Sequence, residues 1–350
     1  MKRPMLSFAR LPRVVFMVGV AALLGSLAPP ARAVTIDMVT VGDPNNAPDT
    51  TGNPNPAGAV ADAFQIMKFE FTNQQYTDFL NAVDPDGNNP NSVYIANMGS
   101  DARGGISFTS GAASGSKYAI RTNMGDKPVN YVSWFDAARV ANWLQNGQGS
   151  GSTETGAYTL VGGQTSGTAP AANPGASYFL PTEDQWYKAA YYKGGSTNAG
   201  YWDYATQSDS DPTAVTAGET GIGSAGNAGN FANFNQAADW NSQDGNVTTV
   251  GTNGGASAYG AFDMSGNIFE WNDLTGAPGS SRGLRGGGWN DIAFGLSSSG
   301  RFSYDPSNEF DNVGFRLASP VAVPEPSTWV MGLAGIVCGG YLRFRRRKQA

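Results

Sequence analysis

The stretch from Ala258 to Trp271, AYGAFDMSGNIFEW, constrains the fold of this chain more than any other segment. Gly266-Asn267 is typical of a tight turn, and Asp263 and Glu270 flank it. A turn there brings both carboxylates toward one point. It also brings there several carbonyl oxygens that do not pair within a strand ladder. Such oxygens suit a hard cation such as Ca²⁺. The alternative is that Asp263 caps the turn, Glu270 is solvated and the aromatic residues are core.

Composition favours a loop-rich fold over a helical bundle. The chain has 350 residues, of which 47 are glycine, and only 14% are charged. It has no histidine, and its one cysteine is Cys338 in an apolar C-terminal stretch. Histidine-based acid–base catalysis, histidine metal sites and disulfides within the chain are therefore excluded.

The charges are distributed unevenly. Of the 22 basic residues, ten lie before Val34 or after Pro326, where there is no acid. The segment between carries 12 basic and 28 acidic side chains, a net charge of −16. Such a surface repels nucleic acid and attracts divalent cations, so we expect no nucleic-acid partner. Simple solubility of an exported protein explains the charge equally well.

Residues 1–33 are typical of a secretory signal peptide. Four basic residues are followed by an apolar run over 14–27 and by the small-x-small pattern Ala31-Arg32-Ala33. We expect an exported protein that begins near Val34. Residues 34–60, rich in Pro, Asn, Asp and Gly, form a lead-in segment.

Three predicted helix N-termini share one local sequence pattern. The stretches 72–75, 133–136 and 182–185 each place a hydroxyl residue three positions before an acid or amide, which is a capping-box pattern. We predict helices over about 73–83, 134–145 and 183–192, each with a buried aromatic stripe. A strand is expected over 63–71. Residues 97–125 and 147–175 are predicted to be surface loops or short hairpins.

Three motifs in fixed order carry a family resemblance: YG…MSGNIFEW, RGGGW at 285–289 and VGFR at 313–316. They resemble the sulfatase-modifying factor family, which includes the formylglycine-generating enzymes, and the resemblance covers roughly 64–318. It implies an α+β fold of the C-type-lectin-like, formylglycine-generating-enzyme kind, with short strands, a few helices and long loops. We assign this domain to residues 61–319.

The resemblance also implies two calcium sites. The family holds its first calcium with an Asn and the next carbonyl, then an Asp and a carbonyl two residues on. The corresponding residues are Asn233, Phe234, Asp244 and Asn246. The second site uses Asp263, the carbonyls of Gly266 and Ile268, and Glu270. Arg301 and Arg316 are expected to pair with acids of these calcium loops.

The family's reaction centre is missing. Formylglycine-generating enzymes bind copper through two cysteines shortly after the glycine motif, and Asp291 and Leu296 stand at about those positions. Soft copper prefers sulfur, and the iron-dependent relatives use histidines, so neither copper nor iron is expected. The resemblance places the former active-site groove at Trp289, Asn290 and Asp291.

Residues 320–350 resemble the PEP-CTERM sorting signal. Val-Pro-Glu-Pro-Ser at 323–327 precedes an apolar run over 329–342 and five basic residues over 343–348. The apolar run predicts a membrane helix with its basic end in the cytoplasm. The resemblance implies cleavage by an exosortase-type sorting enzyme. The alternative is a permanent single-pass anchor.

Together these features predict an exported, surface-sorted, calcium-stabilised binding protein whose partner is an exopolysaccharide or another surface component. One alternative is a formylglycine-generating-type oxidase, or another protein-modifying enzyme with unrecognised chemistry. A purely structural matrix protein is the other.

Overall fold

The computed structural model of this chain describes residues 33–321; the predicted signal peptide, but for its last residue, and the predicted tail beyond residue 321 lie outside it. Five helices occur in the described part: α1 (Asn73–Val83), α2 (Asn97–Ser100), α3 (Trp134–Gln145), α4 (Glu183–Tyr191) and α5 (Ala293–Leu296). The strands there are β1 (Met38–Val41), β2 (Phe64–Met67), β3 (Ile106–Phe108), β4 (Tyr118–Ile120), β5 (Thr213–Ala214), β6 (Phe231–Ala232), β7 (Phe269–Asn272), β8 (Arg282–Arg285), β9 (Phe302–Tyr304), β10 (Val313–Gly314) and β11 (Ala318–Pro320).

All three predicted capping boxes are confirmed. In α1, α3 and α4 the cap hydroxyl of Thr72, Ser133 or Thr182 accepts from the backbone N–H three residues later, and that residue's side chain accepts in return. The starts of the helices therefore match the prediction. The last one ends at Tyr191, one residue early, because Tyr192 adopts an extended backbone.

The strands form a four-stranded sheet in the order β10-β7-β8-β9, a three-stranded sheet β1-β2-β11 and two strand pairs. The strand predicted over 63–71 is only four residues long, since β1 pairs with β2 over Phe64–Met67, β11 pairs with it over Phe64–Ile66, and the chain then turns toward α1. The loop predicted over 97–125 contains the hairpin β3–β4, and also α2, which was not predicted.

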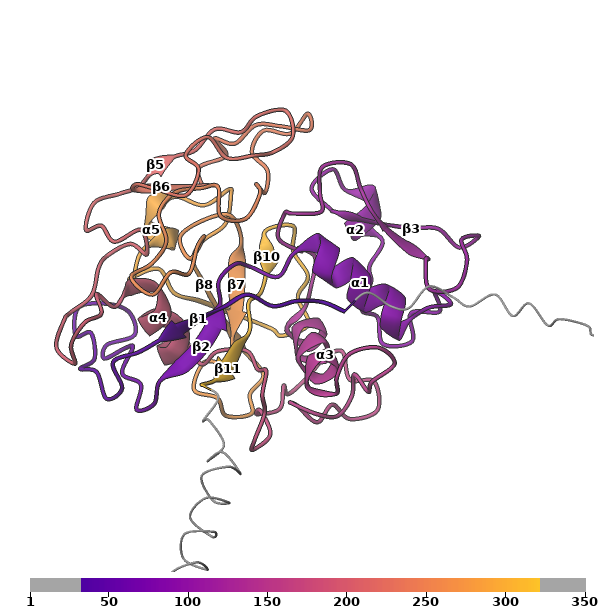
Figure 1. The fold of residues 1–350 in the computed structure, drawn as a ribbon, viewed down its shortest axis with the longest axis horizontal. Coiled ribbons are helices and arrows are strands. Elements are labelled where there is room, and N and C mark those ends of the chain that lie inside the picture. Colours follow the sequence, from indigo (N-terminus) through magenta and orange to yellow (C-terminus); the bar gives the residue numbers. More distant parts are fainter. Residues whose placement is uncertain (1–32, 322–350) are drawn as a thin grey trace, which may run out of the picture. The chain divides into compact units, whose positions relative to one another are not determined.

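Two apolar clusters support these layers. The larger one joins α1 and α3 to the central sheet: Phe79 of α1 lies 5.3 Å from Trp143 of α3 between ring centroids, and Trp271 of β7 is fully buried in the same cluster. The smaller one packs α4 against the β1-β2-β11 sheet. Figure 1 shows α1 and α3 on one side of β7 and β10, with α4 near β1, β2 and β11 on the other.

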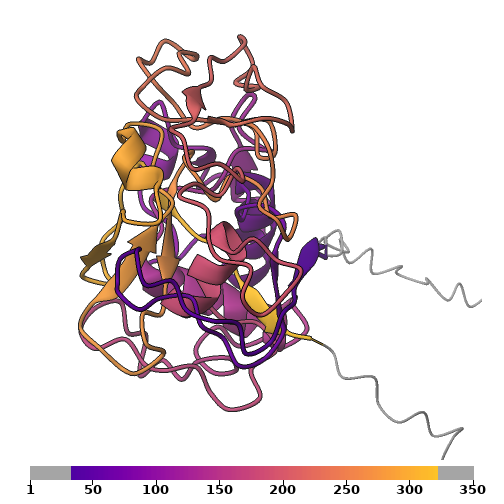
Figure 2. The ribbon, with the colours of Figure 1, turned by 90° about the vertical axis from the view of Figure 1, so that its left-hand side faces the viewer.

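Long irregular segments connect these elements, as Figure 2 shows. The predicted α+β, loop-rich fold class is thereby confirmed. Over residues 33–321 the structure has no helix with the length and apolar character needed to cross a bilayer. The helix predicted over 329–342 falls beyond these residues.

Candidate functional site

The predicted turn at Gly266-Asn267 is confirmed. Both residues have positive φ, 94° and 69°. A Cβ on Gly266 would lie 2.5 Å from the carbonyl oxygen of Asn233, so only glycine fits there. Asn267 donates its backbone N–H to that same oxygen at 2.8 Å. The turn therefore presses directly against the loop that contains the other predicted calcium ligands.

Glu270 is fully buried in an ion pair, so the alternative of a solvated Glu270 is wrong. Its two carboxylate oxygens accept from Nη2 and Nε of Arg316, both at 2.6 Å, and Oε2 also accepts from the indole of Trp186 at 2.7 Å. The predicted pairing of Arg316 with an acid of the predicted calcium loops is confirmed.

Asp263, on the other side of the turn, is also buried. Its carboxylate accepts from the backbone N–H of Gly251 at 2.5 Å and from Nδ2 of Asn253 at 2.9 Å. Burial raises the pKa of Asp263 above its usual value, although these two donors oppose that shift.

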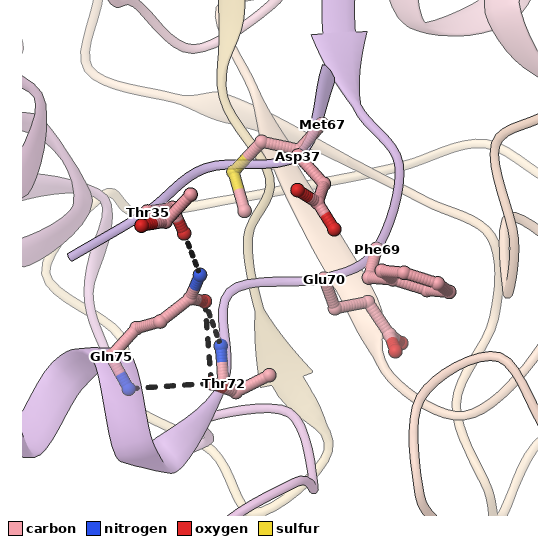
Figure 3. A pocket seen from close by; sticks show the side chains of 7 residues that line it. All are labelled: Thr35, Asp37, Met67, Phe69, Glu70, Thr72 and Gln75. Carbon is pink, nitrogen blue, oxygen red and sulfur yellow. Dashed lines mark hydrogen bonds between the residues drawn. The ribbon is translucent and has the colours of Figure 1, made fainter. Parts of the chain in front are cut away.

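Glu70 joins these acids and was missed by the sequence analysis. Its side chain is fully buried; Oε2 accepts from Asn267 at 2.9 Å, and within residues 33–321 Oε1 has no hydrogen-bond partner. Burial, reinforced by the charges of Asp263 and Glu270, raises the pKa of Glu70 well above its usual value. Figure 3 shows its carboxyl pointing away from Thr72 and Gln75, with which it lines a cavity of about 270 Å³.

The first predicted calcium loop meets the turn through Asn233. Its Nδ2 donates to the carbonyl of Asn246 at 2.8 Å and to Oδ1 of Asn267 at 3.1 Å. The carbonyl of Phe234 accepts from Ala237 at 3.3 Å. Asp244 is exposed, and its carbonyl accepts from Arg103 at 3.1 Å. Asn233 and Asn246 are thus brought together, whereas Asp244 lies at the surface.

Several oxygens around the turn suit a cation. In the described part of the chain, Oδ1 of Asn233 is buried without a partner, and the carbonyls of Gly266 and Ile268 accept no hydrogen bond. Oε2 of Glu270 already accepts two hydrogen bonds, whereas Oε1 accepts one, from Arg316, and keeps a second lone pair. No group of three or more acids within 33–321 is arranged to hold a metal. A hard cation here would therefore depend on amide and backbone oxygens as much as on carboxylates.

A cavity of about 270 Å³ opens beside the predicted groove, and Asn290 lines it. Tyr304 and Phe310 are 43% and 40% exposed, and their rings meet edge to face at 5.8 Å. Nδ2 of Asn312 donates to Oδ1 of Asn290 at 2.9 Å. The remaining lining residues are Phe269, Leu284, Asp311 and Val313. Two amides and a carboxylate thus lie among accessible aromatic rings.

The other two predicted groove residues lie beside this cavity rather than in its lining. Trp289 is buried, and its backbone N–H donates to the carbonyl of Asn267 at 2.8 Å. The carbonyls of Trp289 and Asp291 accept from the backbone N–H groups of Gln236 and Asn235, both at 2.8 Å. The Asp291 carboxylate accepts from the N–H of Ile292 at 2.8 Å, and burial raises its pKa.

Leu296, at the second expected cysteine position, is fully buried. It packs in a small cluster with Tyr204, Ala232 and Phe234. Both positions where the family carries copper ligands are therefore built differently here, with a half-buried carboxylate at one and an apolar core side chain at the other. Neither supplies the soft sulfur that copper prefers.

The expected pairing of Arg301 with a calcium loop is wrong. Arg301 forms a bidentate ion pair with Glu183 at the start of α4, at 2.8 and 2.9 Å. Arg285 contacts the same carboxylate at 2.8 Å. This pairing follows from the short return of the chain after α5, which brings Arg301 to the N-terminus of α4, where negative charge is favoured.

The sulfatase-modifying factor enzyme 1-like domain family matches residues 29–321. Inactive C-alpha-formylglycine-generating enzyme 2 of Mus musculus is 36% identical over 74 residues, which are 19% of this chain and only 24% of that protein.

Two solved structures are also similar. CarF has 22% identity and a TM-score of 0.48, over 83% of this chain and 100% of that chain. Treponema denticola variable protein 1 has 19% identity and a TM-score of 0.46, over 81% of this chain and 94% of that chain. The family match covers most of this chain and includes the three ordered motifs. This chain therefore belongs to the sulfatase-modifying factor enzyme 1-like domain family and has the formylglycine-generating-enzyme fold.

Proposed function

We propose that this protein is a binding protein of the cell surface or extracellular polymer, in which the cavity beside Asn290 replaces the reaction centre of the family. The single observation that carries the proposal is the lining of that cavity. Accessible rings of Tyr304 and Phe310 offer faces for sugar rings, and the amides of Asn290 and Asn312 offer paired donors and acceptors.

The lack of a second thiol to form a pair supports binding over oxidation. The whole chain has one cysteine, Cys338, and Leu296 buries an apolar side chain where a copper ligand would be needed. An oxidase of the family's type would need a thiolate pair at this place. The curated mouse relative is itself described as inactive.

The test is binding of the extracellular polysaccharide purified from cells that produce the protein, measured by calorimetry with the exported domain. We expect binding, and we expect Tyr304→Ala and Phe310→Ala each to weaken it about tenfold, a loss of about 1.4 kcal/mol per ring. Phe108→Ala is the matched control, since Phe108 is 37% exposed with ring partners outside the cavity. Absence of binding, or equal losses in all three variants, contradicts the proposal.

We further propose that Ca²⁺ stabilises the domain, held by Asn233, Phe234, Asp244 and Asn246 in one loop and by Asp263, Gly266, Ile268 and Glu270 at the turn. Oδ1 of Asn233 has no hydrogen-bond partner within residues 33–321, which supports this because a cation would satisfy it, and the buried Glu70 beside Asn267 adds negative charge nearby. Calcium would supply structural charge compensation for the buried acids, and the side chains of this chain would keep the turn closed.

Surface sorting is proposed from the tail. The PEP motif, the apolar run and the basic cluster support export and processing by an exosortase-type enzyme. Mass spectrometry of the mature protein tests this: we expect a C-terminus near residues 323–327, whereas an intact basic end at residue 350 indicates a permanent anchor.

A further inference from the structure

Arg103, between α2 and β3, contacts both the first predicted calcium loop and the wall of the cavity. Its side chain is 18% exposed. Nε donates to the carbonyl of Gly245 and Nη2 to the carbonyl of Asp244, both at 3.1 Å. The guanidinium carbon lies 4.1 Å from the ring centroid of Trp289, and Nη1 lies 4.0 Å from Oδ2 of Asp311.

The backbone on either side fixes this arrangement. Nδ2 of Asn130 donates to the carbonyl of Arg103 at 3.0 Å and to that of Asp311 at 2.8 Å. Asp311 and the neighbouring Asn312 line the cavity. One amide therefore links the backbone of Arg103 to that of Asp311 in the cavity wall, while the Arg103 guanidinium contacts the carbonyls of residues 244 and 245.

A planar guanidinium suits these contacts where a lysine would not. A guanidinium is able to lie over an indole ring while its N–H groups donate within its own plane to two neighbouring carbonyls. Movement of the 244–245 turn removes both acceptors at once. The guanidinium then loses its orientation on Trp289 and beside Asp311.

We propose that Arg103 is a positioning residue that transmits the conformation of the 233–246 loop to the cavity wall at Asp311 and to Trp289 beside it. This deepens the proposed function and rests on it for the identity of the cavity as the ligand site. Whatever orders the loop, a bound cation included, then also orders the cavity.

The test is a ligand-free double-mutant cycle on the described domain, followed by hydrogen–deuterium exchange. Asp239→Ala loosens the turn, because Oδ1 of the exposed Asp239 accepts from the N–H of Gly245 at 2.8 Å. With Arg103 present, we expect this change to speed exchange in a peptide covering 308–313 about tenfold. In the Arg103→Met background we expect less than about a twofold change, and in Arg103→Lys an intermediate one.

Lys117→Met is the control for loss of a positive charge, since Lys117 contacts Ser110 instead. In that background the full effect of Asp239→Ala should persist. Equal effects of Asp239→Ala with and without Arg103, or no effect at all with Arg103 present, overturn the proposal. The double-mutant cycle contains no ligand. If the protein fails to bind polysaccharide, the proposed function is contradicted, but the proposed role of Arg103 as a positioning residue is not.

Discussion

The turn at 263–270 and the cavity wall formed by lining residues of 290–313 are adjacent, yet they are built in opposite ways. At the turn, buried charges such as Glu270 and Arg316 are paired and fully enclosed. At the cavity wall, Tyr304 and Phe310 leave about two-fifths of their surface to solvent. The two regions meet where Trp289 donates its N–H to Asn267. The difference indicates that the family motifs maintain the scaffold, while the accessible aromatic rings beside Asn290 form the part of the surface where we propose that ligand binds.

The largest expected effect comes from breaking the buried ion pair. Glu270→Gln or Arg316→Met leaves one charge uncompensated in a fully enclosed site, which costs about 3–5 kcal/mol of unfolding free energy. Denaturant unfolding measures this. Tyr304→Ala, at the cavity, should cost about 1 kcal/mol or less. Similar losses at both places would remove the contrast between the two regions.

A smaller effect is expected at the turn glycine. Gly266→Ala adds a Cβ against the carbonyl of Asn233 and should destabilise by about 2–3 kcal/mol. Gly260→Ala is the matched control: its φ of 89° is similar, but the nearest atom, in Val39, is 3.6 Å away. It should cost only about 1 kcal/mol. Equal melting temperatures for the two variants would show that the close approach does not matter.

Local sequence motifs show which parts of the structure could be predicted from the sequence alone. Capping boxes and helix lengths follow from local hydrogen bonding, so the starts of α1, α3 and α4 were predictable. The turn at Gly266-Asn267 was predictable because both residue types readily adopt positive φ. The pairing of Arg316 with an acid of the predicted calcium loops was also predicted, and the structure shows that this acid is Glu270.

Contacts between distant segments could not be predicted in this way. Glu70 is an ordinary acid in the sequence, and only the fold brings it beside Asn267. Tyr304 and Phe310 are separated by a turn, and nothing local predicts that their rings meet at the cavity. Arg301 was assigned to the wrong acid because its partner, Glu183, lies 118 residues away.

Removal of calcium should act on the turn and its neighbouring loop. At calcium concentrations near 100 times Kd, binding to the folded state adds about 2.7 kcal/mol, so EDTA should lower Tm by roughly 5 °C. Asn233→Ala should shrink this difference, because it deletes an oxygen that has no hydrogen-bond partner among residues 33–321. An identical Tm with EDTA and with calcium, read by calorimetry, would rule calcium out as a stabilising ligand.

The smallest expected effect concerns the segment that carries Phe310. Burial, together with the neighbouring Asp136, raises the pKa of Glu309 to about 8. Its protonated form stabilises the fold fully below about pH 4.5, and this contribution is lost as the pH rises through about 8. Glu309→Gln should flatten that decline and raise Tm at pH 9 by about 2 °C. If Glu309→Gln leaves the pH profile of Tm unchanged, protonation of Glu309 does not stabilise the segment that carries Phe310.

The central claim is that this protein keeps the fold of its family without the family's oxidase chemistry. The direct measurement is incubation of the domain with copper, oxygen and a sulfatase-type cysteine peptide, followed by mass spectrometry of the peptide. A formylglycine-generating enzyme serves as the positive control. We expect the peptide to keep its cysteine with this protein, because Asp291 and Leu296 stand where a thiolate pair is needed. Formation of a formylglycine aldehyde would contradict the account.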